Sequence, residues 1–312
     1  MKISVKVPAT TANLGAGFDS LGMALPIYNT ITIEETVLPG TGIEINVIKN
    51  DVLDDLSLEH IPMDENSLIY KAVELLYNSI GQNPSELKIT VQSQIPVARG
   101  LGSSASVIVG GLMAANELLG RPADEVALLS IAAEVEGHPD NITPAFVGGL
   151  VMSSLEDDGR VIYRKLEWPQ EWDITVCVPD YELSTDISRS VLPQEVELAD
   201  AVFNAKRMGM FVQAVNTKDA ELMKYALQDR LHQPYRMKLV PGLDKIIENL
   251  KHEENVLGCV LSGAGPAIVI ISQKNNLDKI KSIVKDTWES LNVKVNIMTL
   301  PVEKQGAQII NE

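Results

Sequence analysis

The sequence is poor in the residues that build metal and redox centres. Its 312 residues include two cysteines and four histidines, and neither a CxxC nor an HExxH motif occurs. A structural zinc site is therefore not expected. Cys177 and Cys259 each lie in a short apolar run, which predicts buried free thiols rather than a disulfide.

Positive charge is also scarce. Lysine and arginine number 26 against 42 aspartates and glutamates, a net charge of −16. General nucleic-acid binders and membrane-surface binders need basic patches, so neither class of partner is expected. An anionic small ligand is not excluded, because backbone N–H groups and a few placed cations can bind phosphate in an acidic protein.

Long apolar segments are missing as well. No apolar run reaches the roughly 18 residues that suggest a membrane-spanning helix. The start, MKISVKVPAT, lacks the long apolar core of a signal peptide. A cytoplasmic protein is the default expectation.

Strand and helix patterns alternate along the whole length. The composition, 45% hydrophobic, 22% charged and 4% aromatic, is that of a soluble globular protein with an aliphatic core. Strands are expected, for example, over residues 2–7, 87–93 and 172–179, and helices over 103–119, 123–137 and 195–215. Such a mixture in both halves predicts an α+β protein of one large or two ordinary domains.

Three local boundaries follow from the same patterns. The helix over residues 64–81 is expected to begin at a cap formed by Asp64 or Asn66. Residues 138–144 are expected to form a loop, and residues 145–154 a strand. The mixture of strand-like and helix-like segments changes after Asp157. This change predicts an N-terminal domain over residues 1–160 and a C-terminal domain over 161–312.

The most informative stretch is PVARGLGSSAS, from Pro96 to Ser106. Gly100 and Gly102 let the backbone approach a ligand and adopt positive φ. A helix is expected to start just after them, and unpaired N–H groups at a helix N terminus favour an anion. The stretch fits a triphosphate, with serine hydroxyls available for Mg²⁺ and Arg99 nearby for charge.

Two common nucleotide motifs do not explain this loop. A Walker A loop needs a Gly-Lys pair, and the chain has none. GLGSSA matches the dinucleotide pattern GxGxxA, but a second helix follows where that fold requires a strand ending in an acidic residue. A phosphate loop of another kind, or a tight turn before a capped helix, remains.

Three motifs together decide between these readings. PATTANLGAGFDSLG near the start, PVARGLGSSAS in the middle and LSGAGPA near the end occur in this order. They resemble the signature motifs of the galactokinase, homoserine kinase, mevalonate kinase and phosphomevalonate kinase (GHMP) superfamily. The resemblance covers the whole chain. It implies an α+β fold of an N-terminal ribosomal-protein-S5-like ATP-binding domain and a C-terminal ferredoxin-like GHMP kinase domain, with the active site in the cleft between them, and ATP and Mg²⁺ as cofactors.

Within the superfamily, the first motif is most similar to that of the homoserine kinases. GHPDNITPAFVGG and STDISRSVLP agree with this, and DRLHQPYR is consistent with it. The resemblance implies ATP-dependent phosphorylation of L-homoserine to O-phospho-L-homoserine, a step of threonine biosynthesis, and suggests a homodimer. The alternatives are another small-alcohol kinase, such as an archaeal-type shikimate kinase, and an inactive GHMP-fold binding module.

The resemblance also implies the nucleotide and metal sites. Ser104 and Glu134 are expected to bind Mg²⁺, because a hard cation prefers oxygen ligands. Glu136 is the rival to Glu134, since the segment before the His-Asp-Asn stretch is shorter than usual in the family. The residues expected to bind ATP are Pro96, Val97, Ala98, Arg99, Gly100, Leu101, Gly102, Ser103, Ser104, Ala105, Ser106 and Asn66.

The acceptor site follows from the charges of homoserine. A zwitterion with a hydroxyl needs an anion, a cation and a polar group. Asp19 is expected to bind the ammonium group. Arg189 and Arg236 are expected to bind the carboxylate. Asn13, Asn141 and His138 are expected to bind or position the hydroxyl. Asn141, Arg189 and Asp140 are the catalytic candidates, with Asp140 either a base or a structural anchor, because phosphoryl transfer needs no strong base.

Overall fold

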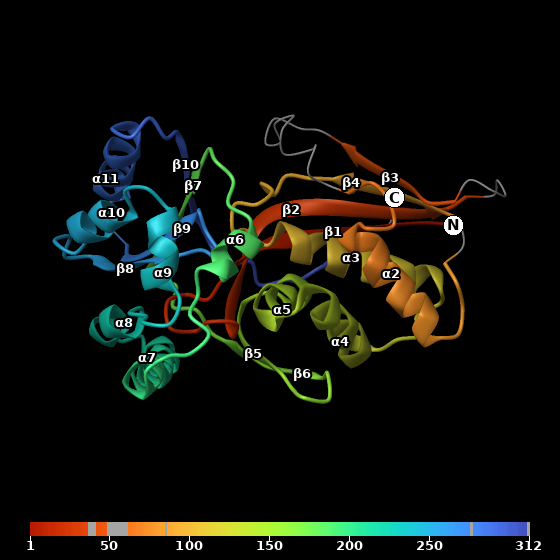
Figure 1. The fold of residues 1–312 in the computed structure, drawn as a ribbon, viewed down its shortest axis with the longest axis horizontal. Helices are drawn as coiled ribbons and strands as arrows, with labels where there is room; N and C mark the ends of the chain where they lie inside the picture. Colours follow the sequence, from red (N-terminus) through yellow and green to blue (C-terminus); the bar gives the residue numbers. More distant parts are fainter. Residues whose placement is uncertain (37–41, 49–61, 85, 275–276, 311–312) are drawn as a thin grey trace.

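The computed structural model describes residues 1–36, 42–48, 62–84, 86–274 and 277–310. Two β-sheets, each covered by helices, lie end to end along the molecule (Figure 1). This architecture confirms the predicted α+β class. The cleft that matters for function lies where the two sheets meet.

The first sheet is built mainly from the N-terminal half of the chain. Its main path runs β11-β1-β2-β4-β3, and β5 joins it by pairing with β2 and β6. The pairing is antiparallel except between β3 and β4. The strands are β1 (Lys2–Ala12), β2 (Leu21–Glu35), β3 (Glu44–Ile48), β4 (Leu87–Gln92), β5 (Leu150–Leu155), β6 (Val161–Leu166) and β11 (Gln308–Ile310).

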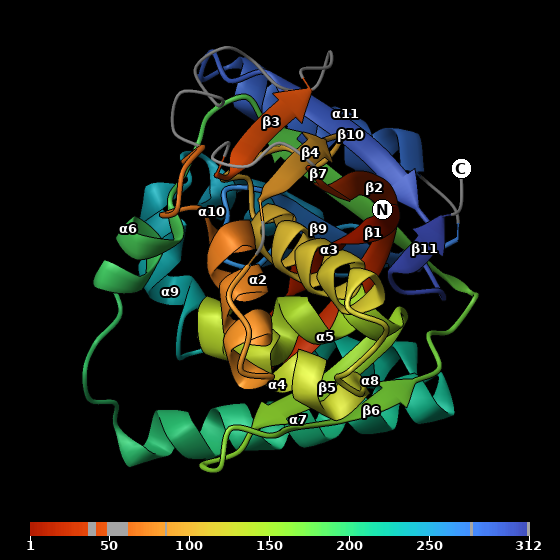
Figure 2. The ribbon, with the colours of Figure 1, turned by 90° about the vertical axis from the view of Figure 1, so that its right-hand side faces the viewer.

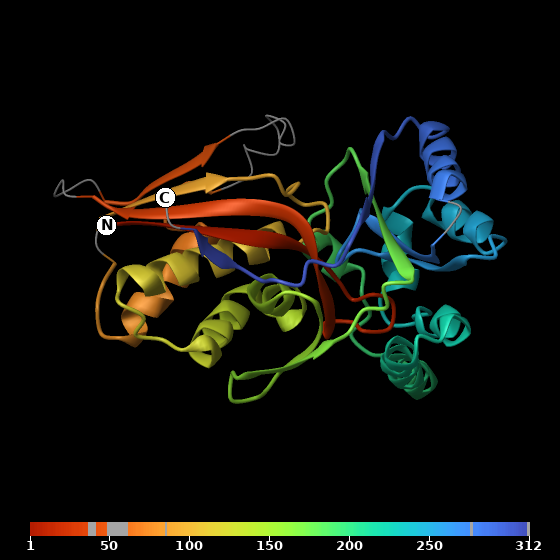
Figure 3. The same ribbon diagram turned by 180° about the vertical axis from the view of Figure 1, so that it is seen from behind.

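Four helices cover one face of this sheet, as Figures 1 and 3 show from opposite sides. They are α2 (Leu68–Ser79), α3 (Ser103–Leu118), α4 (Glu125–Glu136) and α5 (Pro139–Val147). Alternate strand residues such as Val5 and Ile31, which are register partners, are fully buried beneath them. The core is aliphatic, as the composition predicts.

The second sheet is four-stranded and antiparallel, in the order β10-β7-β9-β8. Its strands are β7 (Trp172–Pro179), β8 (Val256–Leu261), β9 (Ile268–Gln273) and β10 (Val295–Leu300). The helices of this half are α6 (Thr185–Ser190), α7 (Leu198–Thr217), α8 (Ala220–Ala226), α9 (Gln233–Arg236), the 3-10 turn η1 (Met237–Leu239), α10 (Leu243–Leu250) and α11 (Leu277–Glu289).

Each sheet with its helices forms one body, and the first and second bodies share a hydrophobic core. Met23 and Leu25 of β2 belong to the same buried cluster as Val176 of β7 and Phe211 of α7. The helices α10 and α11 contribute to a separate cluster, which Trp288 anchors. The shared core fixes the ends of β1 and β2 against the second sheet and thereby sets the geometry of the cleft.

Three predicted boundaries differ from the structure. Residues 138–144, expected as a loop, begin helix α5, because Pro139 occupies the first helical position, where proline is favourable. The following strand begins only at Leu150, after Gly148 and Gly149 have ended the helix with positive φ. The cap of α2 is Ser67, rather than Asp64 or Asn66.

The chain does not pass from one sheet to the other in a single step. β6 pairs with β5 in the first sheet, although it lies just beyond residue 160. The segment after β10 runs back to the first sheet, where β11 pairs with β1 (Figure 3). The division into residues 1–160 and 161–312 remains a prediction.

The cysteines and the apolar segments agree with the composition. Cys177 and Cys259 are free thiols. Burial raises the pKa of Cys177 well above its usual value and that of Cys259 to about 12, so both thiols are chemically quiet. Among the described residues, no helix is long and apolar enough to cross a membrane.

Candidate active site

A cavity of about 340 Å³ lies where the two bodies meet. The first body contributes the β1–β2 loop, residues of β2, β3, β4, α2, α4 and α5, and the loop and first turns of α3. The second body contributes residues around α6, α9 and the β8–β9 loop. The lining contains all three motifs that the sequence singled out. Its two ends differ, with mainly apolar walls toward β3 and β4 and charged groups toward α6 and α9.

Three loops that are far apart in the sequence are hydrogen-bonded to one another beside the cavity. The Ser262 hydroxyl lies 2.6 Å from the Gly100 carbonyl oxygen and 2.8 Å from the Thr11 hydroxyl. The Asn13 side-chain amide donates to the Gly263 carbonyl oxygen at 2.9 Å. A Cβ on Gly100 would lie 2.2 Å from the Ser262 carbonyl oxygen, so the close approach requires glycine.

The N terminus of α3 faces the cavity without a side-chain cap. Gly102 precedes the helix in the left-handed region, with φ of 67°, and the first turn contains no acidic residue. The unpaired N–H groups and the helix dipole therefore present partial positive charge. Ser103 and Ser104 line the cavity at this end. The arrangement suits a phosphate group.

Ser104 faces an acid across this end of the cavity. Its hydroxyl donates to Glu136 Oε1 at 2.6 Å, which joins the first turn of α3 to the last turn of α4. Burial raises the pKa of Glu136, and the Ser104 hydrogen bond partly opposes this. A hydroxyl and a carboxylate beside a phosphate-binding helix terminus form an oxygen donor set of the kind that Mg²⁺ prefers.

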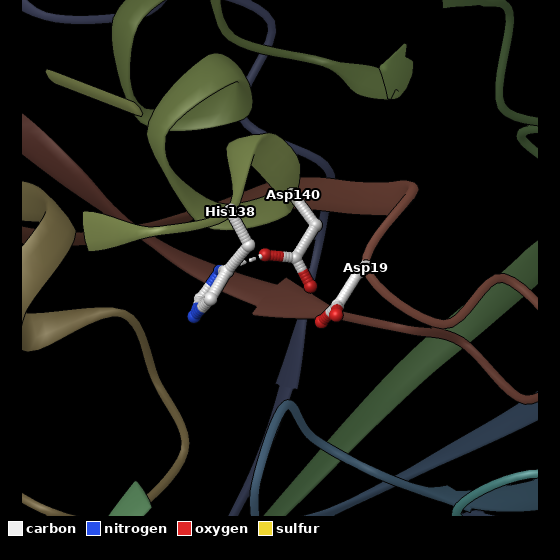
Figure 4. A group of neighbouring side chains, drawn as sticks. All are labelled: Asp19, His138 and Asp140. Atoms are coloured by element: carbon white, nitrogen blue, oxygen red, sulfur yellow. Dashed lines mark hydrogen bonds and ion pairs between the residues drawn. The ribbon is translucent and has the colours of Figure 1, made fainter. Parts of the chain in front are cut away.

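Two aspartates and a histidine form a cluster at the charged end of the cavity, which is called the acceptor side below (Figure 4). Asp19, His138 and Asp140 turn toward one another, and one ligating atom from each lies within 4.8 Å of the others. His138 Nδ1 and Asp140 Oδ1 are 2.6 Å apart. Burial disfavours the protonated imidazole, but the bond to Asp140 and the charges of the neighbouring acids together raise the pKa of His138.

Asn141 is held between two neighbours. Its side-chain oxygen accepts a hydrogen bond from the Thr10 hydroxyl at 2.7 Å, and its amide donates to Asp140 Oδ1 at 3.3 Å. Asn141 also lines the cavity. The side chain is thus oriented by Thr10 of β1 and Asp140 of α5 at the wall of the cavity.

Two arginines of the second body complete the acceptor side. Arg189 on α6 forms an ion pair with Asp19 at 2.8 Å. Arg236 on α9 is almost completely buried and donates to the backbone oxygens of Ser188 and Gly263 at 3.2 and 3.3 Å. In the described part of the chain, no carboxylate forms a salt bridge with Arg236. A buried guanidinium without a salt-bridge partner favours binding of an anion, because a buried charge is costly unless it is paired.

Comparison with known proteins shows the family to which the chain belongs. Residues 67–149 match the GHMP kinases N terminal domain, and residues 211–290 match the GHMP kinases C terminal domain. The curated homoserine kinase of Caldicellulosiruptor saccharolyticus is 43% identical over 311 residues, which cover 99% of this chain and 97% of that protein. The chain belongs to the homoserine kinase family of the GHMP kinases. This confirms the resemblance that the three motifs show.

Further relatives of the homoserine kinase family agree. The homoserine kinase of Clostridium botulinum strain Langeland is 40% identical over 309 residues, covering 99% of both chains. The crystal structure of homoserine kinase from Cytophaga hutchinsonii matches with a TM-score of 0.86 at 27% identity, covering 99% of this chain and 97% of that one. The two-domain fold is therefore shared over its full length.

The geometry favours Glu136 over Glu134 as the metal ligand. Glu134 is exposed and does not line the cavity, whereas Glu136 lines it and bonds to Ser104. Two residues along a helix correspond to a rotation of about 200°, so the two glutamates cannot face α3 together. The rival, Glu136, is the residue in position.

Three residues predicted to bind ATP do not line the cavity. Ala105 and Ser106 lie on the fully buried face of α3, and Ser106 bonds to Ser103 and Asn29 rather than facing a ligand. Asn66 is exposed, and its side chain donates to Asp64. The adjacent Ser67, which is the N-cap of α2 in place of Asp64 or Asn66, lines the cavity instead. The predicted residues from Pro96 to Ser104 all line the cavity.

Two predicted polar groups are in the site but already have protein partners. Arg99 forms an ion pair with Glu182 at 3.2 Å and donates to the Val97 carbonyl oxygen, so its charge links the two bodies. Asn13 donates to Gly263, and its oxygen accepts the Asp19 N–H at 3.0 Å. Both residues line the cavity, yet their first role is to hold the loops together.

Sequence reasoning missed Asn29, which orders the start of the phosphate loop. Its side-chain oxygen accepts bonds from the Ser93 hydroxyl and from the N–H groups of Gln94 and Ile95. Its amide donates to Ser106 at 2.8 Å. An asparagine within the apolar alternation of β2 was the available signal, because a buried amide needs partners.

Proposed function

We propose that this protein transfers the γ-phosphoryl group of ATP to the side-chain hydroxyl of L-homoserine. The product is O-phospho-L-homoserine, an intermediate of threonine biosynthesis. The observation that carries the proposal is a single cavity that joins an uncapped helix N terminus to an acceptor side holding Asp19, Arg189 and Arg236. The full-length similarity to homoserine kinases supports the same reaction.

The nucleotide binds at the end of the cavity beneath β3 and β4. Val47, Val91 and Val97 supply apolar walls for a base. The N–H groups at the start of α3 bind phosphate oxygens. Ser104 and Glu136 hold Mg²⁺, which neutralises phosphate charge when it is bound.

The acceptor is recognised by its two charges. Arg236 has unused donor capacity and binds the carboxylate together with Arg189. Asp19 binds the ammonium group, and its present partner is Arg189, at 2.8 Å. A zwitterion inserted between them replaces one ion pair by two. Mevalonate offers no ammonium group to Asp19.

Asn141 and Asp140 act on the hydroxyl. Asn141 directs its free amide hydrogen toward the hydroxyl oxygen and orients it for in-line attack. Asp140 lies beside it and is paired with His138, so the proton of the hydroxyl has an acceptor within the cluster. Because positioning dominates phosphoryl transfer, the orientation by Asn141 carries more of the rate than proton removal does.

A coupled ADP-release assay over a panel of alcohols tests this function. We expect turnover with L-homoserine at saturating ATP and Mg²⁺, and much less with shikimate, mevalonate and galactose. Turnover of shikimate in place of homoserine would identify the alternative kinase. ATP binding without turnover of any alcohol would identify an inactive binding module.

The same family similarity supports a homodimer, and α7 offers the surface. Figures 1 and 2 show α7 on the outside of the molecule. Its exposed face carries Leu198, Val202 and Ala205, and a Cβ on Gly209 would meet nothing within 4 Å. Light scattering should give a dimer for the wild type and a monomer for Val202→Glu, with Val126→Glu on α4 as the control.

Two further expectations accompany the function. The division into an ATP-binding domain over residues 1–160 and a GHMP kinase domain over 161–312 stays a prediction, and both parts contribute residues to the cavity. Location in the cytoplasm fits a biosynthetic kinase that uses ATP. Fractionation of cells that express the protein, with detection by antibody, tests the location directly.

A further inference from the structure

Phe18 lies beside both arginines of the acceptor side. Its ring centroid is 5.1 Å from the guanidinium carbon of Arg236 and 5.7 Å from that of Arg189. The side chain is half-buried and does not line the cavity. Phe18 therefore touches the groups that are placed to bind the acceptor, without being placed to touch the acceptor itself.

A buried histidine fixes the position of this ring. His232 stacks on Phe18 with a centroid distance of 5.1 Å and an interplanar angle of 18°. His232 Nε2 lies 2.8 Å from the carbonyl oxygen of Gly15, in the same loop as Phe18. Asp229 accepts the backbone N–H of His232 at 2.9 Å. The ring is thus held by a chain of contacts that begins in the second body.

The two arginines lie close enough for their charges to act on one another. Burial lowers the pKa of Arg236, and the nearby charge of Arg189 lowers it further, whereas the charges of Asp19, Asp140 and Asp229 oppose this. Arg189 has Asp19 as a partner, whereas Arg236 has only backbone oxygens. A carboxylate beside Arg236 would stabilise its charge but would also occupy the donors that a ligand needs. An aromatic ring attracts a cation without accepting its N–H bonds in the plane of the guanidinium.

We propose that Phe18 is a positioning residue that holds Arg189 and Arg236 together for one carboxylate of the acceptor. The aromatic contact supports Arg189 while it pairs with Asp19, and it supports Arg236 while its Nε and one terminal nitrogen donate to the backbone, which leaves the other terminal nitrogen of Arg236 for a ligand. The site is thereby selective for alcohols that carry a compact carboxylate next to the ammonium group. This inference rests on the proposed function, because it concerns how that acceptor is bound.

Replacement of Phe18 by leucine tests the inference, since leucine keeps an apolar side chain and removes the π face. We expect the KM for L-homoserine to rise about tenfold, within the roughly 2- to 30-fold range of one cation–π contact. The KM for ATP should stay unchanged and kcat should fall less than the KM for homoserine rises. Phe18→Tyr, which keeps the π face, should restore the KM for homoserine.

The chain supplies a matched control. Phe203 also lies beside two arginines, with its centroid 4.2 Å from the Arg207 guanidinium carbon and 4.0 Å from that of Arg230, but it does not line the cavity. Phe203→Leu removes the same kind of contact away from the acceptor side. It should leave the KM for homoserine unchanged. An equal rise in both variants would overturn the proposal.

A second measurement covers the case in which Phe18→Leu does not fold. Stepwise fluorination of the Phe18 ring weakens its attraction for cations with little change in size. The KM for homoserine should then rise with each added fluorine, and a flat response would overturn the proposal. The two hypotheses fail differently. No homoserine turnover by the wild type would contradict the proposed function, whereas normal turnover with an insensitive KM would contradict only the role of Phe18.

Discussion

Glu136 Oε1 accepts a 2.6 Å hydrogen bond from the hydroxyl of Ser104. This bond connects the last turn of α4 to the first turn of α3, so the carboxylate lies beside the helix terminus where phosphate would bind. Glu134, on the same helix, is exposed. The pair of glutamates therefore provides an internal comparison for the metal site.

Glu136→Gln should lower kcat/KM at limiting Mg²⁺ by at least about 10- to 100-fold, the range seen for loss of even an outer-shell partner of a metal. The amide keeps the size of the side chain but removes its charge. Glu134→Gln is the control and should leave the Mg²⁺ dependence of activity unchanged. If only Glu134→Gln changed that dependence, Glu136 would not be the ligand.

Gly102→Ala should impair both folding and nucleotide binding. Gly102 has φ of 67°, and a Cβ there would lie 1.9 Å from the Thr10 hydroxyl oxygen. The left-handed conformation alone costs an alanine about 1–2 kcal/mol, and the contact with Thr10 adds to this cost and moves the loop. Calorimetry and the KM for ATP measure the two effects.

Gly137→Ala separates the two causes. Gly137 also has positive φ, 87°, but a Cβ there would meet nothing within 4 Å. This variant should lose only the roughly 1–2 kcal/mol of the left-handed conformation and keep the KM of the wild type for ATP. Equal losses of stability in the two variants would show that the contact with Thr10 is unimportant.

Arg236→Lys should weaken homoserine binding although the charge is kept. Lysine cannot reproduce the planar donors that bond to Ser188 and Gly263, and so loses the orientation of the charge. We expect the KM for homoserine to rise about 10- to 100-fold, since one hydrogen bond to a charged group contributes about 1.5–3 kcal/mol. Steady-state kinetics measure the change, with the exposed Arg164→Lys as control. An unchanged KM would place Arg236 outside the acceptor site.

His232 should make stability depend on pH. Burial lowers the pKa of His232 below its ordinary value of 6.5, although Asp229 and Gly15 partly oppose this. The neutral form is favoured in the folded state, so its contribution is complete above pH 6.5. As pH falls from 6.5 to the lower folded pKa, the unfolded state binds more protons and stability decreases.

Denaturant unfolding between pH 5 and 7 measures this dependence. His232→Gln should flatten the change of unfolding free energy with pH in this window. His252→Gln is the control, because His252 is exposed. A wild-type slope in His232→Gln would assign the dependence to other groups.

Much of the nucleotide side could be predicted from the sequence. Gly100, Gly102 and the two serines after them impose positive φ and a helix start on a short local segment. The chemistry of phosphate binding is contained in that segment, because backbone N–H groups supply it. Local patterns could not show which of the following residues face inward, and Ala105 and Ser106 turned out to be buried.

The acceptor side depended on tertiary structure. Asp19, His138, Arg189 and Arg236 are spread over more than two hundred residues, and only the family resemblance suggested that they meet. The choice between Glu134 and Glu136 needed the orientation of α4 against α3. The β11 strand was also missed, because a short segment of Gln308–Ile310 pairs with β1 only after the chain returns from the second sheet.

The sequence by itself determined the local chemistry: glycines that permit left-handed turns, serines at a helix start, and three motifs that identify the family. The tertiary structure decided which charged side chains lack a salt-bridge partner among the described residues. Arg99 is neutralised by Glu182, whereas Arg236 is buried beside Phe18 without an acidic partner. The reason is physical, since ion pairing and burial depend on distances between residues from different segments, and these distances are set only when the two bodies pack together.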